Sequence, residues 1–440
     1  MKNNNNLQSA WEALDIVSLN QMQEAALEAT ATDQDVILLS PTGSGKTVGF
    51  LLPVLRRLDA EVKGVQALVM VPSRELALQI EQVFRGMRTG FKVMSAYGGH
   101  SISTELKSMS EAPAVLVGTP GRLEEHLRRE SFTTDTIHTL VLDEFDKALE
   151  FGFWQDMDSI IGQLPTTNLQ RILTSATQAV EIPAFVGMQD PKELNFLTEE
   201  KPKGLTLHAL KAEGNDKLEA LLHLLGLMNN EPALIFCNHR AAVDRIGEHL
   251  KSHELVFDSF HGGLEQDMRE RALMKFRNGS VKLLLTTDLA SRGLDIPEIK
   301  HIIHYQLPQS EEAYTHRNGR TARMHAEGKA YLVCSEEEEI PAYVTSQLEW
   351  LQMPELVTLP ENPEWVTIYF SGGKKQKINK IDIMGLLAKK GKLSREEVGL
   401  IEIKDFASYA AIKREKLDEV LKLLKNERVK KLKLKVAEAK

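Results

Sequence analysis

Short apolar runs separated by longer amphipathic segments set the pattern of most of this chain. In the first half, runs rich in Val, Leu and Ile occupy residues 35–39, 67–71, 114–117, 139–142 and 171–173. The stretch Lys201-Pro202-Lys203-Gly204 reads as a linker, and similar runs return at residues 233–236, 255–259, 281–285, 302–304 and 330–333. Continuous apolar runs are typical of parallel strands that helices cover on both faces. The pattern therefore predicts two tandem doubly wound α/β domains, at residues 1–200 and 205–353.

A different order follows a second break at Pro354, Pro360 and Pro363. The pattern there predicts a strand, a helix, two strands, a helix and a strand, at residues 365–370, 380–389, 398–404, 409–413, 414–425 and 428–434. This βαββαβ order predicts a small four-stranded α+β domain of the RNA-recognition kind over residues 361–440.

The net charge of −8 hides an asymmetry between the ends of the chain. Residues 361–440 contain 20 Lys and Arg against 12 Asp and Glu, a balance of +8, which leaves −16 for the rest. A basic C-terminal domain suggests nucleic-acid binding, whereas charge alone fits a solvated basic surface equally well.

The sequence also carries signals of its compartment. Its two cysteines, Cys237 and Cys334, lie in apolar runs and suggest no disulfide framework. No apolar segment has the length of a targeting signal or a membrane span. We expect a cytoplasmic monomer with no membrane partner.

A phosphate-binding loop follows the first predicted strand: Ser40-Pro41-Thr42-Gly43-Ser44-Gly45-Lys46-Thr47. A strand, a Gly-rich loop and a Lys-Thr pair that opens a helix form the P-loop context, in which backbone N–H groups and the helix N-terminus hold phosphates. Lys46 is expected to meet the β- and γ-phosphates of ATP, and Thr47 to hold Mg²⁺.

Acidic residues follow another buried strand, as Asp143-Glu144-Phe145-Asp146. Asp143 is predicted to bind Mg²⁺ through water, and Glu144 to orient and deprotonate the attacking water. Ser175-Ala176-Thr177 follows the next strand, and its hydroxyls are predicted to link the acidic motif to the other domain.

The second half supplies cations. The stretch His316-Arg317-Asn318-Gly319-Arg320-Thr321-Ala322-Arg323 carries Arg320 and Arg323, which can stabilise charge on a transferring phosphoryl group. Such arginine fingers are worth about three to five decades of rate.

These motifs occur in one order that resembles the motif set of DEAD-box RNA helicases. The other members of the set are Pro72-Ser73-Arg74-Glu75-Leu76-Ala77, Gly98-Gly99, Thr119-Pro120-Gly121-Arg122, Ile235-Phe236-Cys237-Asn238, Gln266-Asp267-Met268-Arg269 and the stretch from Thr287 to Asp295. The resemblance implies two RecA-like domains and an RNA-stimulated ATPase that unwinds RNA locally.

The resemblance also assigns roles to single residues. Nucleotide contacts are implied for Gln23 (adenine), Thr42, Gly43, Ser44, Gly45, Gly293 and Asp295 (ribose). RNA contacts are implied for Arg74, Gly99, Thr119, Arg122, Asn238, Arg240, Gln266, Arg269, Thr287 and Asp288. Coupling between the domains is implied for Asp146, Ser175, Thr177 and His316.

Two departures from the family pattern stand out. Phe145 replaces the usual Ala, a position without an acid–base role, so we expect local repacking and retained activity. The segment before Gln23 has Leu19 and Asn20 in place of the usual residues, and Trp11 is a candidate for the upstream aromatic.

Four stretches of the C-terminal region, Ser371–Ile378, Lys380–Ile383, Val398–Ile403 and Asp405–Tyr409, together resemble the RNA-binding domain of DbpA-type helicases. The resemblance implies large-subunit (23S-type) ribosomal RNA and its ribosomal precursor as partners. Lys374, Lys375 and Lys377 form a cationic loop beside a sheet that carries Tyr369 and Tyr409. Aromatic rings on a sheet can stack on unpaired bases while lysines hold phosphates. Phe406 fits this role and a core position about equally.

Two other functions stay open at this point. One is a non-catalytic, ATP-gated RNA clamp, for which Phe145 is the sequence support. The other is a DNA helicase, which predicts equal stimulation of the ATPase by DNA and RNA.

Overall fold

The structure is a computed structural model that describes residues 4–41, 43–99, 101–177, 181–197, 204–228, 230–291, 299–321, 327–344, 347–353, 358–430 and 432–439, with the backbone alone at 4–6, 290 and 291. The chain divides into two compact units, one built from the residues up to 197 and the other from the residues after 203. Each unit is described by itself. Within the described residues, no helix combines the length and apolar character needed to cross a membrane.

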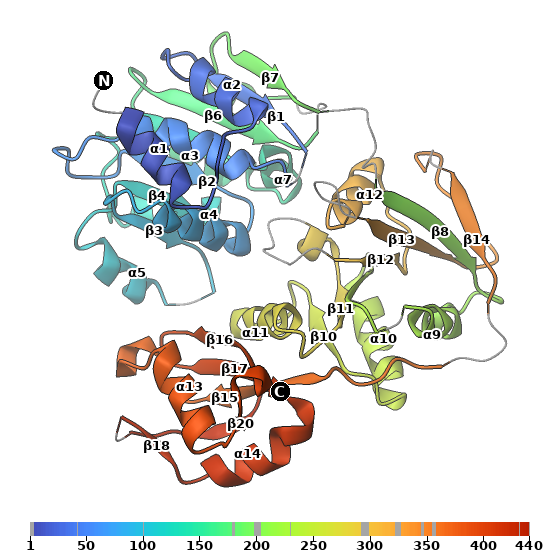
Figure 1. Ribbon diagram of the computed structural model, residues 1–440. Coiled ribbons are helices and arrows are strands. Elements are labelled where there is room, and N and C mark those ends of the chain that lie inside the picture. The colour runs from blue at the N-terminus through green and yellow to red at the C-terminus, as the bar shows by residue number, and fades with distance from the viewer. Residues whose placement is uncertain are drawn as a thin grey trace. The chain divides into compact units, whose positions relative to one another are not determined.

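The first unit contains a parallel seven-stranded sheet in the order β3-β4-β2-β5-β6-β1-β7 (Figure 1). Its strands are β1 (Val36–Leu39), β2 (Ala67–Met70), β3 (Val93–Ala96), β4 (Val115–Gly118), β5 (Thr139–Leu142), β6 (Gln170–Ser175) and β7 (Lys192–Asn195). Its helices are α1 (Asn4–Glu12), α2 (Gln21–Ala29), α3 (Lys46–Arg57), α4 (Arg74–Gly86), α5 (Ile102–Met109), α6 (Pro120–Arg128), α7 (Phe145–Glu150) and α8 (Trp154–Ile161), with the 3₁₀ turn η1 (Ala184–Val186).

Two apolar cores sandwich this sheet. Helices α1, α3 and α4 supply the first core, with residues such as Leu51 and Ile80. Helices α5, α6, α7 and α8 supply the second, with residues such as Leu123 and Met157. The strands are apolar on both sides because both faces are covered, as the sequence pattern predicted.

The second unit begins with a sheet of the same design, again parallel, in the order β10-β11-β9-β12-β13-β8-β14. Its strands are β8 (Leu205–Lys211), β9 (Ala233–Phe236), β10 (Phe257–Phe260), β11 (Leu283–Thr286), β12 (His301–His304), β13 (Gly328–Cys334) and β14 (Leu348–Leu351). Its helices are α9 (Leu218–Gly226), α10 (Arg240–Ser252), α11 (Gln266–Arg277) and α12 (Glu311–Asn318), with the 3₁₀ turn η2 (Asp288–Ser291). Two tandem doubly wound sheets are therefore confirmed.

The third module, residues 361–439, carries an antiparallel sheet in the order β16-β17-β15-β20. Its elements are β15 (Trp365–Phe370), η3 (Lys374–Gln376), α13 (Lys380–Lys389), η4 (Arg395–Glu397), β16 (Val398–Ile403), β17 (Ser408–Lys413), η5 (Arg414–Lys416), α14 (Leu417–Leu424), β18 (Arg428–Val429), β19 (Leu432–Lys433) and β20 (Val436–Glu438). The βαββαβ order is confirmed, but the predicted last strand is wrong. β18 and β19 pair with each other in a separate two-stranded sheet, and β20 completes the four-stranded sheet.

One face of this sheet packs on the end of α11, within the same unit (Figure 1). The hydroxyl of Thr367 accepts a hydrogen bond from Asn278 Nδ2 at 2.9 Å and donates one to Ser280 Oγ at 2.8 Å. Arg277 forms an ion pair with Glu402 at 3.0 Å. Thr367 and Ala411, on this face, are 1% and 0% exposed. The sheet face is therefore a packing surface.

Candidate ATP site and RNA-contacting surfaces

The phosphate loop joins the carboxyl end of β1 to the first turn of α3. Gly45 has φ +88°, a backbone conformation that favours glycine, and a Cβ there would lie 2.6 Å from Gln23 Nε2. Lys46, the first residue of α3, is buried and donates from Nζ to the carbonyl oxygens of Ser40 and, at 3.2 Å, Pro41. Its ammonium group thus lies inside the loop, at the N-terminus of a helix, which is a favourable place for an anion.

Helix α2 holds the loop from the other side. Gln23 Oε1 accepts from Asn20 N at 3.0 Å, and Gln23 Nε2 donates to the carbonyl of Gly45 at 3.2 Å. Asn20 Nδ2 donates to the carbonyl of Ser44 at 2.9 Å. The amide predicted to read adenine is therefore engaged with the phosphate loop and the helix cap, so an adenine contact requires these two bonds to exchange.

Asp143 and Glu144 lie at the carboxyl end of β5, two strands from β1 in the sheet. Asp143 Oδ1 accepts hydrogen bonds from the hydroxyl of Thr174 and, at 3.1 Å, from Glu144 N. Burial raises the pKa of Asp143, which the hydrogen bond from Thr174 and the charge of Lys46 partly offset. Glu144 has φ +48°, a left-handed conformation that turns the chain sharply from strand to helix.

Phe145 follows this turn and is fully buried in the second core. Its ring therefore belongs to the packing under α7, and the acidic side chains beside it keep their positions at the sheet edge. Asp146, at the start of α7, is also buried.

The Ser175–Thr177 segment closes on itself at the end of β6. Ser175 Oγ donates to the carbonyl of Thr177 at 2.9 Å and accepts from Thr177 N at 3.0 Å. The carbonyl of Ser175 accepts a hydrogen bond from Ser40 N at 3.1 Å, which extends the pairing of β6 with β1 to the start of the phosphate loop. The segment is thus attached to the nucleotide site, while its predicted coupling role stays a prediction.

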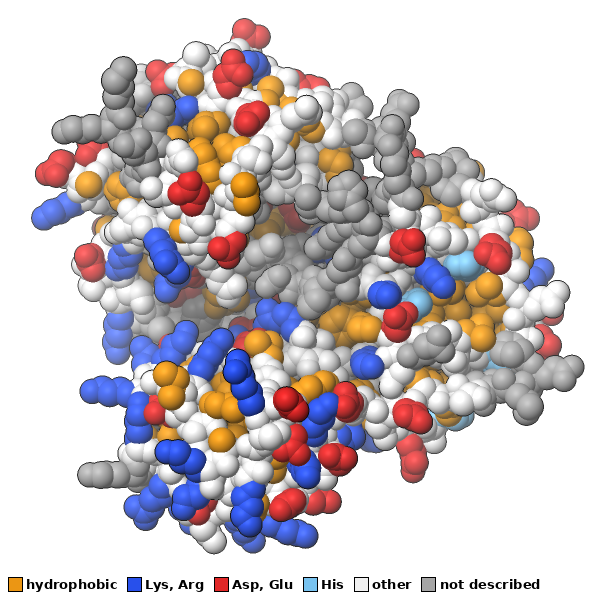
Figure 2. Space-filling view, in the orientation of Figure 1, with side chains coloured by type: hydrophobic (Ala, Val, Ile, Leu, Met, Phe, Trp, Pro, Cys, Tyr) orange, Lys and Arg blue, Asp and Glu red, His pale blue; other side chains and the backbone are white. Residues whose placement is uncertain are grey.

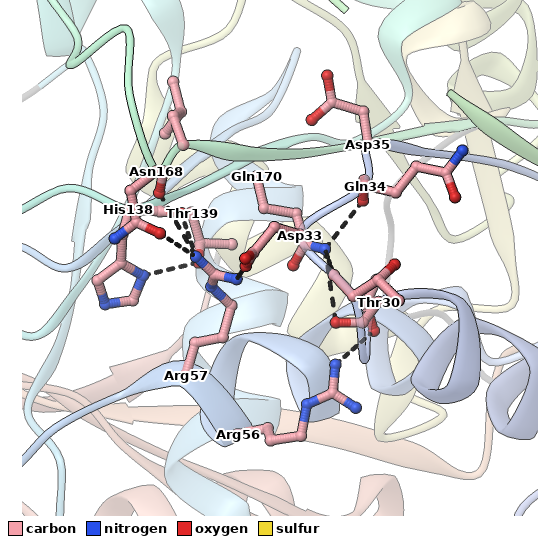
Figure 3. Close-up of polar contacts among 12 residues, drawn as sticks. Thr30, Asp33, Gln34, Asp35, Arg56, Arg57, His138, Thr139, Asn168 and Gln170 are labelled. Atoms are coloured by element: carbon pink, nitrogen blue, oxygen red, sulfur yellow. Dashed lines mark hydrogen bonds and ion pairs between the residues drawn. The ribbon is translucent and has the colours of Figure 1, made fainter. Parts of the chain in front are cut away.

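A polar cluster at the opposite edge of the sheet anchors both helices of the nucleotide site (Figure 3). Arg56, in the last turn of α3, donates to the carbonyl of Leu27 at 2.7 Å and to Thr30 Oγ1 at 3.1 Å, at the end of α2. Arg57 pairs with Asp33 at 2.7 Å. Gln170 is 1% exposed and donates to the carbonyls of Thr32 and Gln34 at 2.7 and 2.9 Å. Helix α2 is thus held to α3 near both of its ends.

Predicted RNA-contact residues of the first unit gather at the ends of β2, β3 and β4. The guanidinium of Arg74 occupies the space beside Gly99, where a Cβ would lie 2.2 Å from Nη1. Gly99 has φ +104°, so a side chain there would be strained, and its Cβ would displace the guanidinium of Arg74. Thr119 caps α6 without a side-chain hydrogen bond to the helix.

Arg122 is held in place by a buried carboxylate on α5. Glu105 is 2% exposed, and it accepts from Arg122 Nε at 2.9 Å, from the fully buried His126 at 2.7 Å and from Tyr97 N at 3.1 Å. Arg122 also pairs with Glu125 at 2.9 Å. Glu105 therefore ties the segment before Gly98 to the helix that carries Arg122.

The second unit is organised around Arg317, whose side chain is fully buried. Its guanidinium donates to both carboxylate oxygens of Asp288 at 2.6 and 2.9 Å and to Asn238 Oδ1 at 2.8 Å. It also lies over the ring of Phe236. Asn238 and Asp288, predicted to lie on the RNA path, thus use these side-chain oxygens to hold Arg317.

The other described residues predicted in this unit lie at helix ends or directly after β11. Gln266 Oε1 accepts from Arg269 Nη2 at 2.6 Å in the first turn of α11. Arg240 is exposed at the start of α10, with its guanidinium 3.3 Å from the Cβ position of Gly262. His316 lies 3.5 Å from Glu312, and both His316 and Arg320 are buried. Thr287 follows β11 directly.

In the third module, the loop with Lys374, Lys375 and Lys377 packs on residues 404–407. Lys374 N and Lys375 N donate to the carbonyls of Lys404 and Asp405 at 2.8 and 2.9 Å. Phe406 lies within residues 404–407 and is 67% exposed. The alternative that Phe406 is a core residue is therefore wrong.

Tyr409 lies on the face that meets α11. Its ring contacts that of Tyr369, with centroids 5.6 Å apart, and burial raises its pKa. Tyr409 is half-buried on this face, which α11 partly covers, and its predicted contact with RNA stays a prediction.

Some predicted residues lie outside the described part of the chain, namely Thr42, Gly293, Asp295 and Arg323. Three buried residues were not predicted: Thr174, Glu105 and Arg317. Thr174 lies in β6 beside other polar residues, Gln170, Arg171 and Ser175, so neither it nor Glu105 carried a local signal. Arg317 stood inside the predicted arginine cluster without a role of its own.

Comparison with known proteins agrees with this architecture. Residues 20–184 match the DEAD/DEAH box helicase family, residues 216–325 the helicase conserved C-terminal domain and residues 367–438 the DbpA RNA binding domain. The chain is 32% identical over 467 residues to ATP-dependent RNA helicase DbpA of Bacillus subtilis (strain 168), covering 98% of this chain and 96% of that protein. It is also 32% identical over 430 residues to DbpA of Escherichia coli (strain K12), covering 95% and 93%. The structure of S. cerevisiae Dbp5 bound to RNA and ADP BeF3 matches with a TM-score of 0.69 and 27% identity, over 79% of this chain and 93% of that one.

Proposed function

We propose a substrate and a nucleotide cycle for this chain, which belongs to the DEAD/DEAH box helicase family and is an ATP-dependent RNA helicase of the DbpA type. The proposed substrate is structured large-subunit ribosomal RNA, in a cytoplasmic ribosome precursor, on which the protein acts as a monomer. The observation that carries this substrate is the third module, which joins a DbpA-type RNA-binding domain to the helicase domains.

Binding of ATP is proposed to exchange contacts inside the phosphate loop. Lys46 Nζ would leave the carbonyls of Ser40 and Pro41 for the phosphate oxygens, and the backbone N–H groups at the start of α3 would hold the same anion. Gln23 would exchange its bond to Gly45 for the adenine edge. Lys46 belongs to α3 and Gln23 to α2. Exchange of their bonds on nucleotide binding would therefore alter the contacts that both helices make with the loop.

The donor set beside the loop fits Mg²⁺. Asp143 and Thr47 offer a carboxylate and a hydroxyl, the hard oxygen ligands that Mg²⁺ prefers. The ion, when bound, neutralises phosphate charge and so assists transfer of the phosphoryl group. Thr174 would fix the rotamer of Asp143, and Glu144 would orient and deprotonate the attacking water.

The second unit is proposed to complete hydrolysis. Arg320 would stabilise charge on the transferring phosphoryl group, and Arg323 is proposed for the same role. ATP binding would bring the two helicase domains together on a short RNA duplex, and release of phosphate would let them separate. Local strand separation, without long-range translocation, follows from such a cycle.

A rate measurement tests the enzymatic part. Glu144→Gln keeps the size of the side chain and removes the base, so RNA-stimulated phosphate release is expected to fall by at least about 100-fold. Equal rates for the variant and the wild type would support the clamp alternative. The burial of Phe145 in the core agrees with the expected local repacking and so supports the enzyme rather than the clamp.

Crosslinking to cellular RNA tests the substrate. We expect crosslinks to concentrate in large-subunit ribosomal RNA, and deletion of residues 361–440 to disperse them while a weaker ATPase with generic RNA remains. A truncated protein that keeps its preference would locate specificity in the helicase domains instead. The ATPase assay with DNA and RNA strands of matched sequence tests the DNA-helicase alternative. Equal stimulation by both would support it, and stimulation by RNA alone would exclude it.

A further inference from the structure

We propose that the third module holds RNA phosphates in a groove beside α14, on the helix side of its sheet. This C-terminal groove, of about 670 Å³, is lined by Lys425, Lys433 and Lys435 with Leu421, Val436 and Ser371. Val436 pairs with Phe370, which points into the core between the sheet and its helices, so the groove opens away from the face that meets α11. The inference rests on the proposed function, in which this module selects RNA.

The helix side of the sheet is the proposed location because the other face already packs on α11. In this module the opposite face packs on α11 through Thr367 and Glu402, and its central positions are buried. RNA would have to displace these contacts to stack on that face. The exposed cations of the module therefore offer a binding surface that needs no rearrangement.

Charge in the groove is not compensated by protein carboxylates. Among the described residues, no acidic group lies within 4.0 Å of the ammonium groups of Lys425, Lys433 or Lys435, and all three side chains are exposed. Nearby acids are already paired: Glu427 with Lys390 at 3.4 Å and Asp382 with Lys430 at 2.7 Å. Three converging cations over an apolar floor repel one another and favour a polyanion.

Backbone contacts join the groove to the predicted RNA loop. Ser371 Oγ accepts from Lys435 N at 2.7 Å, and Ser371 N donates to the carbonyl of Lys435 at 3.0 Å. Lys430 Nζ donates to the carbonyl of Lys377 at 2.7 Å. Ser371 lies three positions before Lys374 in the chain, so the groove adjoins the loop that carries Lys374 and Lys377. Figure 2 shows Lys and Arg side chains gathered over this module.

Alternation along the chain makes a clean variant possible. Lys433 and Lys435 both line the groove and are exposed, whereas Leu434 between them is buried in the core. Replacing both lysines with Ala therefore leaves the core intact. Lys389 and Lys392, exposed on the same module outside the groove, provide a control of equal charge.

The experiment measures binding of the full chain to a labelled hairpin of large-subunit ribosomal RNA from about 0.05 to 0.2 M salt. Each lost phosphate contact reduces the slope of log K against log salt by about 0.7 to 0.9, so K433A/K435A should flatten it by about 1.4 to 1.8. K389A/K392A should keep the wild-type slope, and K433R/K435R should restore it because the charge is retained.

If K433A/K435A and the control K389A/K392A have equal slopes of log K against log salt, the proposal that the groove binds RNA phosphates is wrong. If Lys374→Ala, Lys375→Ala and Lys377→Ala together then still lower the slope, the module binds RNA elsewhere and the proposed function stands. If deletion of residues 361–440 also leaves binding unchanged, the proposed role of the module fails with it.

Discussion

Buried polar residues fix the side chains that are predicted to do chemistry. Thr174, Glu105 and Arg317 are at most 2% exposed, and each contacts a predicted site residue that lies at least 17 positions away in the chain. A buried polar side chain has few alternative partners, so it restricts its neighbour to one rotamer. Substituting one of these buried residues should therefore impair only the function of the site residue that it contacts.

Thr174→Val tests the support of Asp143. The variant keeps the shape of the side chain but removes a hydrogen bond to a charged group, which contributes about 1.5 to 3 kcal/mol. The pKa of Asp143, already raised by burial, should rise further, and the Mg²⁺ concentration for half-maximal ATPase should increase about ten-fold or more. An unchanged Mg²⁺ requirement would show that Thr174 does not act through Asp143.

Glu105→Gln tests the support of Arg122. The neutral amide loses the charge of the ion pair with Arg122 Nε and keeps one acceptor oxygen for the donors that Glu105 now serves with two, so Arg122 should sample more orientations. We expect the RNA concentration for half-maximal ATPase to rise about five- to ten-fold, the loss of about 1 to 1.4 kcal/mol, with maximal rate unchanged.

The exposed Glu111→Gln on the same side of the domain is the control for a change of charge. A lower maximal rate with the same RNA requirement would mean that Glu105 serves the fold alone, and Glu105→Asp should recover part of the RNA affinity.

At the scale of elements, the apolar runs predicted ten of the fourteen strands described in the two parallel sheets and missed β3, β7, β8 and β14. β7 and β14 are edge strands with mostly exposed or half-buried side chains, so they contain no continuous apolar run. The last predicted strand of the third module failed for a different reason. Lys430 adopts φ +47°, in a turn after which β19 pairs with β18 before β20 begins.

The site was predictable where a motif follows a strand and unpredictable where a partner comes from far along the chain. Lys46, Asp143 and Arg74 were identified from local sequence. The bond from Arg317 to Asn238 joins residues 79 positions apart, and sequence spacing does not show it. The packing of the third module on α11 was unpredictable for the same reason.

Gln170→Leu tests the polar cluster that holds the ends of α2 and α3 (Figure 3). The variant removes donors to the carbonyls of Thr32 and Gln34, each bond worth about 0.5 to 1.5 kcal/mol, so the free energy of unfolding should fall by about 1 to 3 kcal/mol. Gln163→Leu removes an exposed bond to the carbonyl of Ser159 and should cost less. If urea unfolding gives the same loss of unfolding free energy for both variants, the buried cluster stabilises the fold no more than an exposed hydrogen bond does.

At the scale of the whole molecule, buried and half-buried histidines should set the acid limit of stability. Burial lowers the pKa of His138, His208, His261 and His301, and lowers that of His304 to about 3. Each folded group stays neutral at a pH where the unfolded chain takes up a proton. Stability is therefore complete above the unfolded pKa, near 6.5, and declines as the pH falls below it.

His304→Gln isolates the largest of these effects. His304 is fully buried and donates from Nε2 to Asn318 Oδ1 at 2.9 Å, a bond that a Gln amide can also make. The variant loses ring contacts with Phe236 and Tyr314, so it should be less stable at neutral pH. Because Gln does not titrate, the deficit should shrink by about 1.4 kcal/mol for each pH unit below 6.5. Urea unfolding at about pH 7.5 and pH 5.5 measures it, with the exposed His239→Gln as control. A deficit equal at both pH values would mean that His304 is protonated in the folded protein, and that the acid limit arises from other groups.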